Sequence, residues 1–210
     1  MDEVNAALIA AGRENDKVEI VAAGKNRDRE TLLRLYSTGC VSAIGENRVQ
    51  EFREKYTPEI TWDVIGRLQT NKVKYVVGKV RLIQSLDRES LAEEIERVCA
   101  ARGVEQQCLV EINSGEEEAK GGIRAEELEE FLHALEKYQH VVVRGVMAVA
   151  PRDIGEDKLT ECFSKARDAF LAVRGKRAGF DILSMGMSAD FRVALKCGAN
   201  MLRPGKILFE

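Results

Sequence analysis

Short apolar runs alternate along the chain with longer stretches that mix apolar and charged residues. The apolar runs are three to nine residues long and rich in Val, Ile and Leu, which is typical of buried strands. They predict strands at residues 18–23, 41–44, 61–65, 80–85, 107–113, 141–149, 180–184 and 200–202.

In the stretches between these runs, apolar residues recur every three to four positions, as they do on one face of a helix. Gly39 and Gly103 stand where two of these helices should stop, and Asp87 stands where one should be capped. Helices are predicted at residues 28–37, 47–55, 70–77, 87–102, 125–138, 157–174 and 189–197.

Strands that alternate with helices predict a parallel sheet with crossover helices. An open doubly wound sheet and a closed (β/α)8 barrel of the TIM type both fit that description. Eight strands favour the barrel, and no G-x-G-x-x-G follows the first strand, as a dinucleotide-binding sheet would require. With only three prolines and no linker of biased composition, we expect one domain over residues 1–210 and no second domain.

Composition narrows the class of protein. Apolar residues make up 45% of the chain and charged residues 32%, with a net charge of -3, so nothing favours nucleic acid or an anionic membrane surface as a partner. The longest apolar runs are far below the roughly 18 residues that span a bilayer, and the acidic start does not resemble a signal peptide. The five cysteines are scattered and form no C-x-x-C pair, which predicts reduced thiols in the cytoplasm and no metal site.

In a (β/α)8 barrel, functional residues lie in the loops that follow the strands, and phosphate is usually bound after strands seven and eight. Here those loops contain Ser184, Gly186, Ser188 and Gly205. Hydroxyls and exposed backbone amides of this kind can bind an anion, and the predicted start of a helix after Ser188 adds to that tendency. A helix cap at Ser188 and simple glycine turns remain the alternative for either loop taken alone.

Lys25 directly follows the first strand. If side-chain alternation continues, it points into the barrel mouth above Val21 and Ala23, where partial desolvation would favour a neutral, nucleophilic amine. Such an amine serves to form an imine with an aldehyde. A solvated lysine at a strand end is the alternative, but a phosphate site across the mouth indicates a ligand with both an aldehyde and a phosphate.

Several segments, in their order and spacing, resemble the pyridoxal phosphate homeostasis protein family, which is alanine racemase N-terminal-domain-like. The resemblance extends over nearly the whole chain. The segments that carry it are residues 20–25 (IVAAGK), 44–51 (IGENRVQE), 62–72 (WDVIGRLQTNK), 110–113 (VEIN), 120–123 (KGGI), 144–148 (RGVMA) and 183–188 (LSMGMS).

The resemblance implies a barrel like that of the fold-type III enzymes and pyridoxal 5'-phosphate (PLP) as cofactor, joined to Lys25 as a Schiff base. Asn47 would lie beside the cofactor ring, and Arg203 would face its pyridine nitrogen. Because arginine stays charged, it cannot protonate that nitrogen, so the ring is a weaker electron sink than one paired with a carboxylate. The remaining residues implied to contact the ring or phosphate are Ser184, Met187, Ser188 and Gly205.

The sequence departs from the family pattern in four places. Gly24 replaces the usual serine before the lysine, and Asp63 replaces the usual histidine after the tryptophan. In the last motif Pro204 removes a backbone N–H, and Lys206 stands where a threonine usually offers a hydroxyl, so we expect Lys206 to supply a charge to the phosphate instead. The tail after Phe209 is short, and we expect the last helix of the family to be missing.

The resemblance implies a protein of intracellular PLP homeostasis that stores or buffers the cofactor, or delivers it to PLP-dependent apoenzymes. We expect a cytoplasmic monomer. The alternative is a racemase-like PLP enzyme with weak activity, but racemisation needs an acid/base on each ring face, and all four tyrosines fall on predicted helices or their ends. An aldolase using the same lysine, and an interaction surface on the charged helix at residues 124–137, were the other possibilities; a solvated outer helix explains that stretch more simply.

Overall fold

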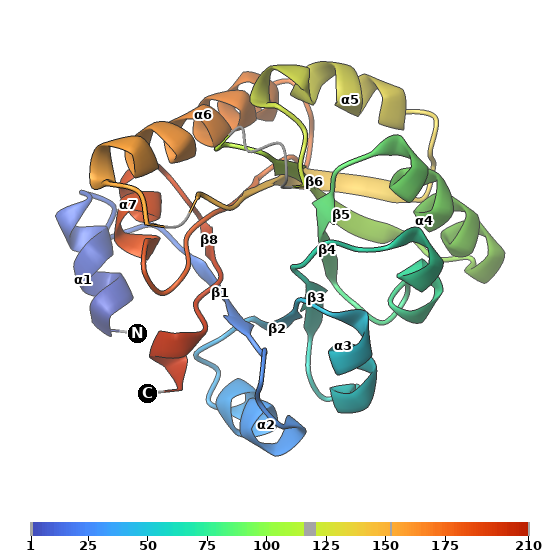
Figure 1. Cartoon of the computed structure of the whole chain (residues 1–210), viewed down its shortest axis with the longest axis horizontal. Coiled ribbons are helices and arrows are strands. Elements are labelled where there is room, and N and C mark those ends of the chain that lie inside the picture. Colours follow the sequence, from blue (N-terminus) through green and yellow to red (C-terminus); the bar gives the residue numbers. More distant parts are fainter. Residues whose placement is uncertain (1, 116–120, 152, 210) are drawn as a thin grey trace.

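Eight parallel strands pair in chain order, and β8 pairs with β1, so the sheet closes into a barrel (Figure 1). The computed structural model describes residues 2–115, 121–151 and 153–209. The closed barrel confirms the predicted fold. Its strands are β1 (Glu19–Ala23), β2 (Ala43–Glu46), β3 (Trp62–Val64), β4 (Leu82–Leu86), β5 (Gln106–Ile112), β6 (Val141–Ala148), β7 (Ile182–Ser184) and β8 (Met201–Leu202).

Alternation along these strands divides the apolar side chains into two cores. A small inner core fills the barrel, and a larger outer core lies between the strands and the helices. On β1, for example, Val21 belongs to the inner core and Ala22 to the outer one. The buried members of the inner core are Val21, Ala43, Leu82, Leu109, Met147 and Met201.

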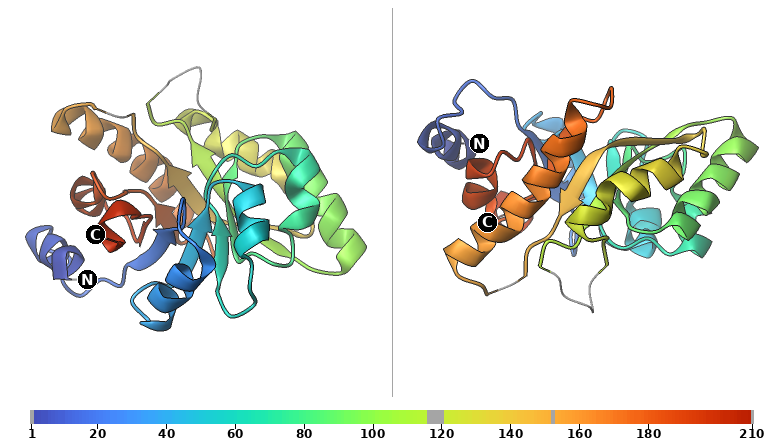
Figure 2. Two further views of the ribbon diagram at one scale, coloured as in Figure 1. Left: turned by 60° about the horizontal axis from the view of Figure 1, so that its bottom comes forward. Right: turned by 90° about the horizontal axis from the view of Figure 1, so that it is seen from above.

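The helices surround the barrel and cover its outer face, as the two side views also show (Figure 2). The long helix α6 packs against β6, and α1 packs against α7. The α-helices are α1 (Asp2–Ala10), α2 (Arg29–Ser37), α3 (Val49–Lys55), α4 (Glu89–Arg102), α5 (Leu128–Leu135), α6 (Glu156–Arg174) and α7 (Phe191–Lys196). Three 3-10 turns accompany them, η1 (Thr70–Tyr75), η2 (Ala125–Glu127) and η3 (Lys206–Leu208).

The helices differ from the sequence prediction at several of their ends; α3, for example, begins at Val49 and α5 covers only Leu128–Leu135. Asp87 does not cap α4: the N-cap is Arg88, and the Asp87 carboxylate instead pairs with the guanidinium groups of Arg67 and Arg88. The helix α7 begins at Phe191 rather than at residue 189. The Asp190 carboxylate, just before it, accepts a hydrogen bond from the Met187 amide. The helix α1 was not predicted. The stop at Gly103 is confirmed, since this glycine has φ 63°.

Two further features concern the length of the helices and the state of the cysteines. Among the described residues, no helix is both long enough and apolar enough to cross a membrane. All five cysteines are free thiols, and four of them are buried. Burial raises the pKa of Cys108, deep in the outer core, well above the ordinary value for a thiol. Such thiols are inert packing groups rather than reactive ones.

Candidate functional site

The loops after β7 and β8 meet at the carboxyl end of the barrel, as the sequence predicted. The Ser188 hydroxyl accepts a hydrogen bond from the Gly205 amide at 3.0 Å and lies 3.4 Å from the Ile207 amide, which also donates to it. The Ala23 amide donates to the Pro204 carbonyl at 2.8 Å, so the Gly205 loop lies directly beside the end of β1. A hydroxyl and backbone amides are thus gathered next to the strand that leads to Lys25.

Two glycines lie where these loops pack closely, and one of them, Gly186, is required by its conformation and its neighbours. Gly186 has φ 94°, and a Cβ built on it would lie 2.6 Å from the Ala194 Cβ. A Cβ on Gly205 would lie 3.3 Å from the Ala23 Cβ, on the inner side of β1. The two glycines therefore let the loops pack closely against α7 and the end of β1.

Other charged and apolar groups complete this end of the site. Met187 is half-buried in the β7 loop, and Lys206 is exposed at the start of η3. Asp190 is half-buried beside the same loop, and burial raises the pKa of its carboxyl, which favours the neutral form in the neighbourhood of an anion.

Arg203 lies inside the barrel, with 3% of its surface exposed. Its Nη1 donates to the Ser184 hydroxyl at 2.6 Å, and its Nη2 donates to the Ala148 carbonyl at 2.8 Å. Burial lowers the pKa of Arg203 to about 10, against the opposing charges of Asp190 and Glu111. The guanidinium is therefore still charged at pH 7, and the Ser184 hydroxyl accepts one of its hydrogen bonds.

Lys25 sits higher than the sequence analysis expected. Backbone pairing with β2 continues to Gly24, whose amide donates to the Gly45 carbonyl, and the chain then turns through Asn26 with φ 60°. The turn lifts Lys25 above the inner core, and its side chain is exposed rather than partly desolvated. The expected burial of the Lys25 side chain was wrong because the inward and outward alternation of β1 ends at Ala23, before Lys25.

A buried ion pair supports the backbone just before Lys25. Lys55 Nζ donates to Glu46 Oε1 at 2.9 Å and to the Gly24 carbonyl at 3.0 Å, and it lies 3.2 Å from Glu51. Glu46 is 1% exposed, and this burial raises the pKa of its carboxyl despite the ammonium. A Cβ on Gly24 would lie 2.6 Å from Glu46 Oε1, which explains why glycine rather than serine precedes the lysine here.

Asn47 follows β2, the neighbour of β1, and lines a cavity of about 200 Å³ together with Glu111 and Arg67. Asn47 is exposed, and its backbone packs so closely on Gly66 that a Cβ there would lie 2.4 Å from the Asn47 carbonyl oxygen. Burial, with the nearby charge of Asp87, raises the pKa of Glu111 to about 7. Glu111 belongs to the VEIN segment but was not among the predicted site residues. Its inward position on β5, two residues after Leu109, is the signal that could have singled it out.

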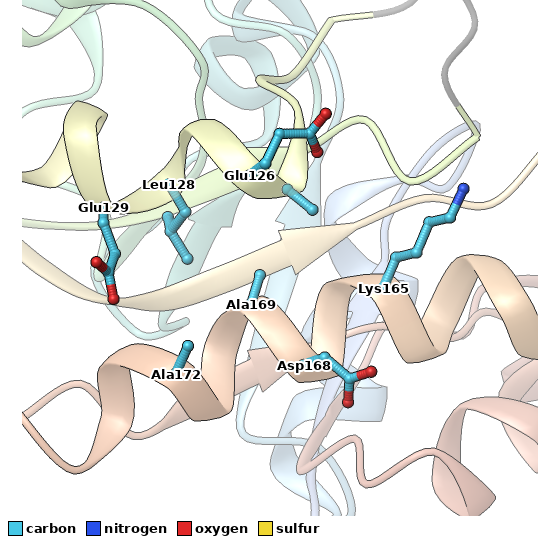
Figure 3. A pocket seen from close by; sticks show the side chains of 8 residues that line it. Glu126, Leu128, Glu129, Lys165, Asp168, Ala169 and Ala172 are labelled. Carbon is cyan, nitrogen blue, oxygen red and sulfur yellow. The ribbon is translucent and has the colours of Figure 1, made fainter.

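A second hollow lies outside the barrel, between η2–α5 and α6 (Figure 3). It has a volume of about 480 Å³, and its rim bears Glu126, Glu129, Lys165 and Asp168. Leu128 is buried at its base. None of the predicted site residues lines it, and its charged rim fits the solvated outer helix that the sequence predicted for residues 124–137.

Comparison with known proteins gives a consistent result. A family model described as the N-terminal domain of alanine racemase matches residues 17–210. A pyridoxal phosphate homeostasis protein from Aquifex aeolicus is 38% identical over 214 residues, covering 100% of this chain and 93% of the relative. Another from Escherichia coli is 29% identical and covers 99% of this chain and 92% of the relative.

Solved structures agree. A protein of Bifidobacterium adolescentis superposes with a TM-score of 0.91 at 30% identity, covering 99% of this chain and 90% of that one. PipY from Synechococcus elongatus, with PLP bound, has a TM-score of 0.83 at 28% identity, covering 99% of this chain and 100% of PipY. A diaminopimelate decarboxylase at 14% identity shares the barrel alone. With the family model spanning nearly the whole chain and the Aquifex relative matching along its length, the chain belongs to the pyridoxal phosphate homeostasis protein family, whose barrel is that of the alanine racemase N-terminal domain.

Proposed function

We propose that this protein binds PLP covalently on Lys25 and serves PLP homeostasis by storing, buffering or delivering the cofactor. The observation that carries the proposal is the meeting of the Ser188 hydroxyl and the Gly205 amide beside Ala23, at the end of β1 and two residues before Lys25. The similarity to PipY, whose structure holds PLP, along the whole of both chains supports it.

The side chains present fit the three functional parts of PLP. When bound, PLP supplies an aldehyde that an amine can attack and a ring that withdraws electrons. Lys25 offers the amine, and the exposed position of its side chain leaves it accessible to a cofactor entering from solvent. Ser188 and Gly205 would hold the phosphate, with Met187 and Lys206 beside it. Asn47 would flank the ring from the β2 side.

Arg203 would face the pyridine nitrogen. It stays protonated at neutral pH, so it can orient the nitrogen by donating a hydrogen bond but cannot transfer a proton to it. Ser184 contributes to this site by accepting from Arg203, and its hydroxyl hydrogen is directed away, toward Gln84. These residues bind and orient the cofactor, and the proposal assigns none of them a catalytic role.

The test is the absorption spectrum of the protein after incubation with PLP, followed by borohydride reduction and mapping of the labelled peptide. Wild type should show a visible band that hydroxylamine removes, and a reduced label on Lys25. Lys25→Ala should lose both, whereas Lys17→Ala, which changes an exposed lysine below the start of β1, should behave as wild type. A label that persists in Lys25→Ala would overturn the site assignment.

The finer parts of the proposal are a monomeric state, a cytoplasmic location and delivery to PLP-dependent apoenzymes. The free state of all five thiols supports the cytoplasm, where thiols stay reduced. Light scattering would test the monomer. For delivery, the rate at which the loaded protein activates an apoenzyme should exceed the rate at which it releases PLP to a trapping reagent; equal rates would indicate release into solution only.

A further inference from the structure

A chain of side-chain hydrogen bonds runs down the barrel interior from Arg203. Its guanidinium donates to Ser184 at 2.6 Å, and the Ser184 hydroxyl donates to Gln84 Oε1 at 2.8 Å. Gln84 Nε2 in turn donates to Asp63 Oδ2 at 2.8 Å. Ser184, Gln84 and Asp63 each have 0% of their surface exposed. The three bonds join β8, β7, β4 and β3 across the inside of the barrel.

Every bond in this chain has its donor on the Arg203 side. A carboxylate can only accept, so Asp63 requires the amide nitrogen of Gln84 and turns the amide oxygen toward Ser184. That oxygen takes the hydroxyl hydrogen of Ser184. Only the lone pairs of Ser184 then remain for the guanidinium, which can only donate. Asp63, three hydrogen bonds away, therefore determines that the Ser184 hydroxyl oxygen accepts from Arg203.

Asp63 is itself held in place from below. Arg81 binds it through two nitrogens, at 3.0 Å from Nε to Oδ1 and 2.7 Å from Nη2 to Oδ2, and also pairs with Glu19 at 2.6 Å. This bidentate fork fixes the plane of the carboxylate. Arg81 also compensates the buried charge of Asp63, so Arg203 does not have to. Asp63 can thus orient Arg203 without forming an ion pair with it.

We propose that Asp63 is a positioning residue for the cofactor, acting on Arg203 through Gln84 and Ser184. This inference rests on the proposed function, because it gives Arg203 the task of orienting the PLP ring. A carboxylate can only accept a hydrogen bond from Gln84, and this imposes one direction on the whole series of hydrogen bonds. The carboxylate thereby selects one orientation of the guanidinium.

The test compares Asp63→Asn and Gln84→Met in the PLP-loaded protein. Gln84→Met keeps the Asp63–Arg81 pair and the side-chain length but removes the bridge, so it stays informative if Asp63→Asn does not fold. Each variant should bind PLP about tenfold more weakly, the effect of one lost hydrogen bond to a charged group. Each should also change the ratio of the near-ultraviolet and visible bands of the bound cofactor, because the donor at its nitrogen is displaced.

Two controls separate positioning from general loss of stability. Leu109→Ala disturbs the same inner core without changing a residue of the hydrogen-bond series from Arg203 to Asp63. It should lower the unfolding free energy but leave the cofactor spectrum unchanged. In a Ser184→Ala background the hydrogen bonds between Arg203 and Gln84 are already lost. Adding Gln84→Met there should cause little further loss of PLP affinity. Fully additive losses, or a Gln84→Met protein with the wild-type affinity and spectrum, would overturn the inference. If wild type itself carried no label on Lys25, the proposed function would fail instead.

Discussion

The Ser188 hydroxyl lies 3.0 Å from the Gly205 amide and joins the two loops that close the barrel at its carboxyl end. Replacing Ser188 by alanine removes this acceptor together with one proposed donor to the phosphate. We expect Ser188→Ala to weaken PLP binding about tenfold or more, as loss of a hydrogen bond to a charged group does, and to lower the unfolding free energy by only about 1 kcal/mol. A spectrophotometric titration with PLP measures the first quantity and urea unfolding the second.

Ser164→Ala is the matched control for this prediction. Ser164 is on α6, and its hydroxyl contacts only the Cys197 sulfur, at 3.9 Å, among the contacts of the described residues. The control should bind PLP as wild type does. Wild-type affinity in Ser188→Ala would mean that the phosphate is held elsewhere.

Gly186 packs so tightly that any side chain there should be costly. With φ 94° and only 2.6 Å between its added Cβ and the Ala194 Cβ, Gly186→Ala combines backbone strain with a steric clash. We expect a loss of about 3 kcal/mol of unfolding free energy. Gly175→Ala should be neutral or stabilising by up to about 1 kcal/mol, since Gly175 has φ -76° and open space around it. Equal unfolding free energies for the two variants would contradict the packing described here.

Much of the barrel follows from the pattern of apolar runs, because strand order and closure need only eight strands separated by helices. The meeting of the loops after β7 and β8 could also be predicted, because both loops lie at the carboxyl end of the barrel. Their binding of phosphate stays a prediction. The helix α1 was missed because its apolar residues at 6–10 are consecutive rather than spaced along one face, and it packs against the distant α7. Its stability comes from a tertiary contact that local periodicity does not reveal.

The chain from Arg203 to Asp63 was beyond sequence reasoning for a different reason. Strict alternation would place Leu82, Gln84 and Leu86 all inside the barrel. A register shift between Ile83 and Leu86 turns Leu86 to the outer core, while Gln84 stays inside. Irregularities of this kind depend on how neighbouring strands pair. Alternation along one strand therefore does not predict which residues of β4 face the barrel interior.

The buried ion pair of Lys55 and Glu46 should contribute strongly to stability. Lys55→Met would leave Glu46, 1% exposed, without its counterion, and we expect a loss of about 3 kcal/mol at pH 8. The loss should shrink toward pH 5, because Glu46 can then be buried as the neutral acid. The double variant Lys55→Met with Glu46→Gln should recover most of the loss at pH 8.

Lys196→Met serves as the control for this ion pair. It breaks the exposed pair of Lys196 with Glu156, and should change the unfolding free energy by no more than about 0.5 kcal/mol. A Lys55→Met protein as stable as this control at pH 8 would show that the Glu46 charge is not buried in solution.

Glu111 should make the stability of the protein fall as the pH rises through neutrality. Its pKa is raised from the ordinary 4.5 to about 7, so the folded state retains a proton that the unfolded chain has already released between these two values. Folding is therefore penalised progressively from about pH 4.5 to pH 7, and fully above it. With partial solvent screening of a half-buried group, we expect the penalty to be on the order of 2 kcal/mol.

Glu111→Gln removes this titration without removing the side chain. The variant and wild type should have similar unfolding free energies at pH 5, and at pH 8 the variant should be more stable by about 2 kcal/mol. Glu46 and Asp190 also have raised pKa values, but they titrate in both proteins, so the difference between the two curves isolates Glu111. Urea unfolding at several pH values between 5 and 8 gives both curves. Parallel curves would mean that Glu111 is ionised at pH 5 and that its neighbours Arg67 and Arg203 outweigh the effect of burial.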